Sequence, residues 1–75
     1  MNFPRISLVA TGNRLKVLME EKGITVRKLQ EALGFANPQA IYKWRRGECL
    51  PTLDNLVVIA LVLETTIDKI IVIDS

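Results

Sequence analysis

The strongest constraint on the fold is a pair of helix-boundary signals in the middle of the chain, with few residues between them. Gly34 ends one short amphipathic segment, because glycine adopts the left-handed conformation at a helix C-terminus without steric cost. Asn37-Pro38 begins the next, since an asparagine N-cap followed by proline in the first helical position is a typical helix start. The sequence therefore predicts a helix-turn-helix over residues 25–46, with a turn of about four residues between the two helices.

Start and stop signals also define the flanking boundaries. Thr25 is a suitable N-cap for the first of the two helices, because its hydroxyl can accept a hydrogen bond from a first-turn N–H. A longer helix before it is expected to begin after Thr11, also an N-cap, and to end at Gly23. The helix that starts at Pro38 should run to about Arg46.

Helical spacing divides residues 38–46 into two faces. The apolar face, which is expected to be buried, consists of Ala40, Ile41 and Trp44. The opposite face recurs at i, i+3, i+4 and i+7, and it consists of Gln39, Tyr42, Lys43 and Arg46. These side chains are long, offer hydrogen-bond donors and include no acid, so this face is expected to be the exposed one.

The rest of the chain completes a helical fold. Thr52 caps the most apolar segment, which is the expected central helix, and Thr66 caps a short fifth helix. The β-branched residues of 6–9 and 70–73 are equally compatible with short extended segments at the two termini. The sequence therefore predicts an all-α fold, one compact five-helix domain over residues 1–75, with the conformation of the termini left open.

The charge is distributed unevenly along the chain. Residues 22–47 carry six basic side chains and one acidic one, whereas residues 48–75 carry five acidic side chains and one basic one. A positive surface attracts polyanions such as nucleic acids, whereas the acidic C-terminal part does not. A merely solvated charged face is the alternative interpretation of the same pattern.

Several classes of protein are disfavoured by what the sequence lacks. It has no histidine and a single cysteine, Cys49, so neither an internal disulfide nor a nitrogen and sulfur metal site is expected. Without a histidine base or a glycine-rich phosphate loop we expect no enzyme and no cofactor. No apolar run approaches the roughly 18 residues of a membrane span, and no secretory signal is visible, so a cytoplasmic protein is expected.

A set of short motifs carries a family resemblance. These are Gly23-Ile24-Thr25, Leu33-Gly34-Phe35, the run from Ile41 to Gly47, Leu50-Pro51 and Asp54-Asn55-Leu56. Their spacing resembles that of the Cro and lambda-repressor type (XRE family) of helix-turn-helix regulators, over roughly residues 12–72. The resemblance implies a lambda-repressor-like DNA-binding domain, in which residues 38–46 form the recognition helix, and a transcriptional regulator that usually acts as a dimer.

The side chains on the exposed face of residues 38–46 suit the major groove of double-stranded DNA. Gln39 can pair with adenine, Lys43 can donate to guanine, and Tyr42 can contact a phosphate or a thymine methyl group. Each also has an interpretation without DNA: Gln39 could cap its own helix, Tyr42 could lie half-buried against the preceding helix, and Lys43 could simply be solvated.

Phosphate contacts are expected from the helix that begins after Thr25 and from the far end of the recognition helix. In the family the first position of that earlier helix is usually a glutamine, but here it is Val26, so the backbone N–H groups behind Thr25 would bind the phosphate. Arg27, Lys28 and Arg46 add positive charge and further contacts to the DNA backbone.

Two other departures from the family pattern affect the packing. An arginine and glutamate that commonly pair are replaced by Met19 and Arg45, and because both partners change together we interpret the site as repacked. Arg45 is then expected to point to solvent. Ala36 makes the turn one residue longer than is common, which shifts the recognition helix slightly.

A function of another class remains open, and so does the dimer surface. The same fold could serve as a protein-interaction module, an antitoxin-like or anti-repressor partner, and the apolar tail 70–73 and Val26 favour that interpretation. For a DNA-binding homodimer the expected interface is the fifth helix with this tail, unless the tail pairs with residues 6–9 of its own chain. No membrane or small-molecule ligand is indicated.

Overall fold

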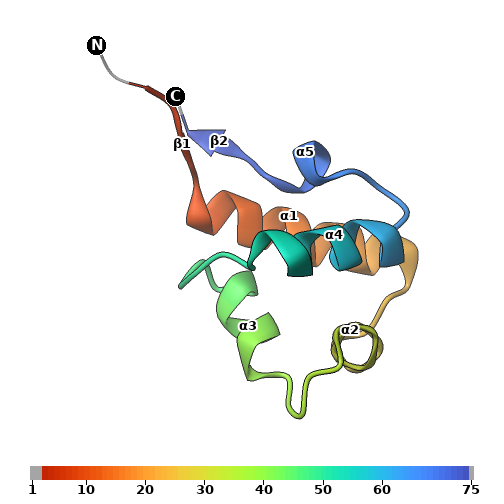
Figure 1. The fold of residues 1–75 in the computed structure, drawn as a ribbon. Helices are drawn as coiled ribbons and strands as arrows, with labels where there is room; N and C mark the ends of the chain where they lie inside the picture. Colours follow the sequence, from red (N-terminus) through yellow and green to blue (C-terminus); the bar gives the residue numbers. More distant parts are fainter. Residues whose placement is uncertain (1–2, 75) are drawn as a thin grey trace.

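The computed structural model describes residues 3–74 of the chain. Its elements, in order, are β1 (Arg5–Ile6), α1 (Leu8–Lys22), α2 (Val26–Leu33), α3 (Gln39–Arg45), α4 (Leu53–Val62), α5 (Ile67–Ile70) and β2 (Ile73–Asp74). Figure 1 shows α2 and α3 on one side of α1 and α4, whereas α5 and the two strands lie on the opposite side. The predicted five-helix architecture is confirmed.

Most of the helix caps expected from threonine and glycine are present, but Thr66 makes no side-chain cap hydrogen bond at the start of α5. The hydroxyls of Thr25 and Thr52 accept hydrogen bonds from first-turn backbone N–H groups, at 3.1 and 3.2 Å. Gly23 and Gly34 end α1 and α2 in the left-handed conformation, with φ of 66° and 73°. Asn37 Oδ1 accepts from the Gln39 N–H at 3.1 Å, but Pro38 and not Asn37 occupies the N-cap position, so α3 begins one residue later than predicted.

The predicted start of α1 is wrong, because Ser7 and not Thr11 caps this helix. The Ser7 hydroxyl accepts a hydrogen bond from the Ala10 N–H at 3.2 Å, and the helix starts at Leu8. Thr11 lies buried within the helix, where its hydroxyl accepts from the Val72 N–H at 3.0 Å. Its side chain therefore joins the two ends of the chain.

The terminal segments are extended only in part. Arg5 pairs with Asp74 and Ile6 with Ile73 in an antiparallel ribbon, β1 with β2. Leu8 already belongs to α1, so only the first part of segment 6–9 is extended. Residues 1, 2 and 75 of the predicted domain lie outside the described residues.

All five helices contribute to one core. Its fully buried side chains are Leu15, Leu29, Ile41, Ile59, Leu63 and Ile70. The expected central helix α4 is buried on one face only, because Leu53 and Leu61 are each 74% exposed. Over residues 3–74, no helix is both long and apolar enough to cross a membrane.

Candidate nucleic-acid interface

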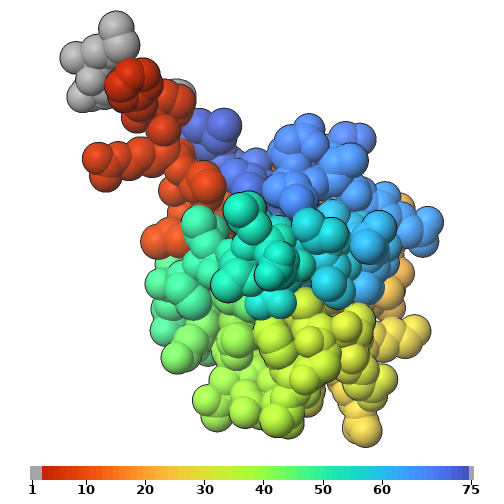
Figure 2. Space-filling view, viewed as in Figure 1, coloured from red at the N-terminus to blue at the C-terminus, as the bar shows by residue number. Residues whose placement is uncertain are grey.

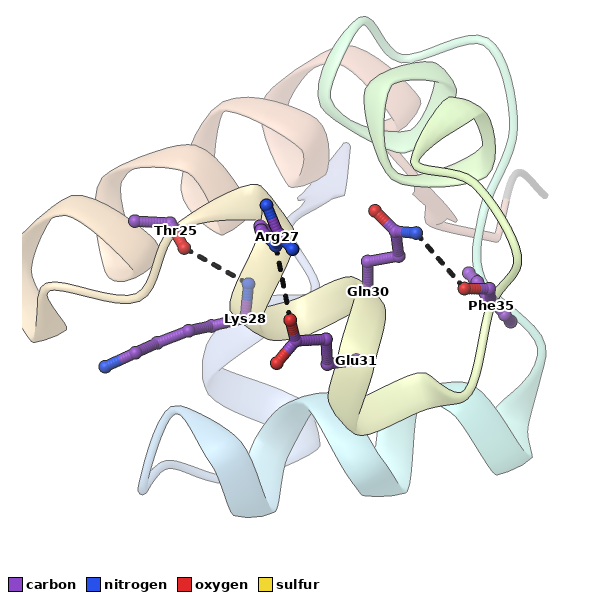
Figure 3. A network of polar contacts seen from close by, with 6 residues as sticks. All are labelled: Thr25, Arg27, Lys28, Gln30, Glu31 and Phe35. Carbon is purple, nitrogen blue, oxygen red and sulfur yellow. Dashed lines mark hydrogen bonds and ion pairs between the residues drawn. The ribbon is translucent and has the colours of Figure 1, made fainter.

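The turn between α2 and α3 is held by an aromatic contact and by hydrogen bonds between Gln30 and Phe35. The rings of Phe35 and Trp44 meet edge to face, with their centroids 5.8 Å apart. The Gln30 side-chain amide donates to the Phe35 carbonyl at 3.2 Å, as Figure 3 shows. Because Trp44 is only 5% exposed, this contact connects the turn directly to the core.

The C-terminal end of α3 packs closely on α1. A Cβ atom at Gly12 of α1 would lie 2.3 Å from the Trp44 carbonyl oxygen and 2.8 Å from that of Arg45. Real Cβ atoms do not approach backbone oxygens so closely, so glycine is the residue that permits this contact. The contact fixes the direction in which α3 presents its outer face.

The two faces of α3 divide as the helical spacing predicts. Ile41 and Trp44 are buried and Ala40 is half-buried. The four polar side chains of the opposite face, which we call the α3 outer face, are all exposed: Gln39, Tyr42, Lys43 and Arg46. The structure therefore brings these four predicted site residues together on one surface.

A shallow groove of about 400 Å³ separates α3 from α2. Its walls include Val26 and Arg27 of α2, and Tyr42 of α3. Tyr42 keeps 43% of its surface exposed, so it both lines the groove and reaches solvent. The backbone N–H of Gln39 donates to Asn37 Oδ1, which leaves the role of the Gln39 side-chain amide open.

The N-terminus of α2 lies across the groove from Tyr42. Thr25 accepts the Lys28 N–H, and helix geometry leaves the first-turn N–H groups of Val26 and Arg27 without intrahelical acceptors. The Val26 side chain is apolar and half-buried, so only the backbone N–H of this residue can bind an anion. The Lys28 side chain extends away from the helix in Figure 3.

Two arginines of the predicted phosphate contacts are engaged by acids. Arg27 pairs with Glu31 one turn along α2, at 3.3 Å (Figure 3), and Arg46 pairs with Glu48. The pairs are largely exposed, so each contributes little to stability, but each lowers the local positive potential. Sequence reasoning missed Glu48 because this acid lies outside the recognition helix, although its place two residues after Arg46 was a usable signal.

Arg45 does not point freely to solvent, so that expectation is wrong. Its side chain is half-buried, and its guanidinium carbon lies 5.9 Å from the centre of the Tyr42 ring. A cation over an aromatic face is attracted by the ring quadrupole, which accounts for this placement. Met19 lies in the core at 3% exposure, as expected of a repacked site.

The apolar tail is largely absorbed by its own chain. Ile70 is 1% exposed, and Ile71 and Val72 are half-buried. Ile73 remains 61% exposed on the ribbon. Of the two alternatives for the tail, packing within the monomer is therefore the one observed, and α5 offers little exposed apolar surface for a dimer.

The sequence matches one family model. It is described as a Cro/C1-type HTH DNA-binding domain, and it covers residues 14–74. This span contains α2, α3, α4 and α5 entirely, together with most of α1. No curated protein and no solved structure matches the chain.

Proposed function

Because the chain belongs to the family of Cro/C1-type helix-turn-helix DNA-binding domains, we propose that it is a transcriptional regulator that reads double-stranded DNA with α3. The observation that carries this proposal is the α3 outer face, on which four polar side chains lie exposed opposite a buried apolar face. A helix of this kind fits the major groove. The role is binding and not catalysis.

Base readout is assigned to the α3 outer face. Gln39 would pair with adenine N6 and N7, and Lys43 would donate to guanine O6 and N7. Tyr42 would contact a thymine methyl group or a phosphate from the edge of the groove between α2 and α3. These three contacts give the protein its sequence preference.

Phosphate binding is assigned mainly to the start of α2. The backbone N–H groups of Val26 and Arg27, behind the Thr25 cap, would hold one phosphate. Lys28 would add a charge contact from the same turn, and Arg46 would add one from the end of α3. Arg27 and Arg46 would exchange their acidic partners for phosphate oxygens on binding.

The proposed regulator acts as a homodimer in the cytoplasm, with residues 1–75 as one domain and no cofactor or small-molecule ligand. One α3 offers too few base contacts for useful specificity, whereas two related by a two-fold axis read half-sites about 34 Å apart. The preferred DNA site is then an inverted repeat.

The alternative function is a protein-interaction module that does not read DNA, favoured by the acids that already engage Arg27 and Arg46. Selection of bound duplexes from a random library separates the two. The regulator should enrich an inverted repeat and should bind nonspecific DNA with an affinity that falls steeply with salt. An absence of both enrichment and salt-sensitive retention would favour the interaction module.

A further inference from the structure

The outer side of α4 carries an apolar stripe that has no partner among residues 3–74. It consists of Leu53, Val57 and Leu61, which are 74%, 49% and 74% exposed. They stand four residues apart, so they form one ridge along the helix, opposite the buried side chains of Ile59 and Leu63. We call these three residues the α4 stripe.

No other helix or strand of the described part of the chain covers the α4 stripe. Figure 1 shows α4 between the side that holds α2 and α3 and the side that holds α5 with the ribbon. In the space-filling view of Figure 2, the outer surface of α4 faces the viewer without another segment in front of it. An exposed apolar ridge of this kind typically marks an interaction surface.

The charges around the α4 stripe favour a protein partner. Within Leu53–Val62 the only charged residue is Asp54, and Glu64 follows shortly after the helix. An apolar surface bordered by acids repels DNA and anionic lipid headgroups. The surface is therefore suited to another apolar protein surface.

The order of side chains along the stripe is self-complementary. A two-fold interface brings the same patch of both copies together, so the patch must match its own reversed order. Leucine, valine and leucine, with equal exposure of the two leucines, read identically in both directions about Val57. In an antiparallel pair, each Leu53 faces a Leu61 and the two copies of Val57 face each other.

We propose that the α4 stripe is the contact between two copies of this chain, with Val57 on the two-fold axis. The proposal rests on the proposed function in one respect, namely that reading an inverted repeat requires a second copy. The interface expected at the C-terminal tail is not available, because Ile70 is buried within its own chain. The lateral position of α4 leaves the α3 outer face of both copies free.

The size of the stripe sets the strength of the dimer. The α4 stripe spans eight helical rises from Leu53 to Leu61, so it is about 12 Å long. A contact of this length falls short of the roughly 800 Å² per partner that stable complexes bury. The dimer is therefore weak in solution and is strengthened when two half-sites on one duplex raise the effective concentration of the two copies.

Sedimentation without DNA tests the contact, with residue 57 as the probe. Val57→Asp and Val57→Lys should each lower the association constant at least about tenfold, because each buries like charges against each other. An equimolar mixture should associate again, since aspartate would then face lysine. Val17→Asp, at a half-exposed position of α1, is the matched control and should associate like the parent.

The outcomes decide the proposal independently of DNA binding. A parent chain that stays monomeric at every concentration, variants that associate like the parent, or a mixture that does not recover would each overturn it. Leu61→Asp, at a more exposed position, provides a second variant should Val57→Asp lose its helical circular dichroism. Unchanged affinity for a single half-site in these variants shows that the interface and the DNA-binding face are separate.

Discussion

Helices α3 and α4 follow each other in the chain and differ in the chemistry of their outer sides. Both bury one face, Ile41 with Trp44 in α3 and Leu56 with Ile59 in α4. The outside of α3 is polar and donor-rich, whereas the outside of α4 is apolar and has no basic residue. Since neither outer side is needed for the core, we propose that its composition reflects what each helix binds, DNA for α3 and a second copy of the chain for α4.

The largest expected effect is on the free energy of unfolding, and it distinguishes apolar residues inside the core from those outside it. Trp44→Ala should lower the free energy of unfolding by about 3–5 kcal/mol, because it leaves a cavity beside Phe35. Leu53→Ala should change it by less than about 0.5 kcal/mol, because that side chain is mostly exposed. Urea denaturation of both variants checks the contrast, and equal losses would show that the α4 stripe is structural.

The next effect concerns how α3 is oriented. Gly12→Ala should cost about 1–3 kcal/mol, because the new methyl group meets the Trp44 carbonyl and forces α1 and α3 apart. Helix propensity alone would instead favour alanine by about 1 kcal/mol, so the sign of the change is diagnostic. Asn13→Ala, at an exposed neighbouring position, is the control and should not destabilise the protein. A gain in stability for Gly12→Ala would disprove the close contact.

The smallest expected effect is electrostatic. Glu48→Gln should tighten binding to random and preferred DNA alike, by less than about 1 kcal/mol, because it releases an exposed Arg46 from its ion pair. Glu20→Gln, an exposed acid on α1, serves as the control for the change in net charge. If both variants bind equally well, Glu48 has no particular influence on the α3 outer face.

What the sequence could predict was local, and what it missed depends on distant residues. The caps at Thr25 and Gly34 and the two faces of α3 follow from neighbours within one or two turns, and these predictions are confirmed. The start of α1 was misplaced because the role of Thr11 depends on Val72, 61 residues away. The exposed side of α4 could not be predicted, because an almost wholly apolar segment does not indicate which side faces the core.

The candidate site shows the same limit. Exposure of Gln39, Lys43 and Arg46 was predictable from helical spacing. The apolar residues Ile41 and Trp44 lie three residues apart and define the buried face, so these polar residues must lie on the opposite one. The placement of Arg45 over Tyr42 was not, because it depends on the choice of side-chain rotamers. The assignment of these residues to bases or phosphates remains a proposal.

The most direct test of the central claim, that α3 reads bases while charged residues hold phosphates, is a DNA titration across a salt series. Gln39→Ala should weaken binding to the preferred site by about 1–3 kcal/mol and leave binding to random DNA nearly unchanged. Arg46→Ala should weaken both alike and lower the salt slope by roughly one unit. Equal weakening of all sequences by Gln39→Ala, or a changed base preference with an intact slope for Arg46→Ala, would contradict the account.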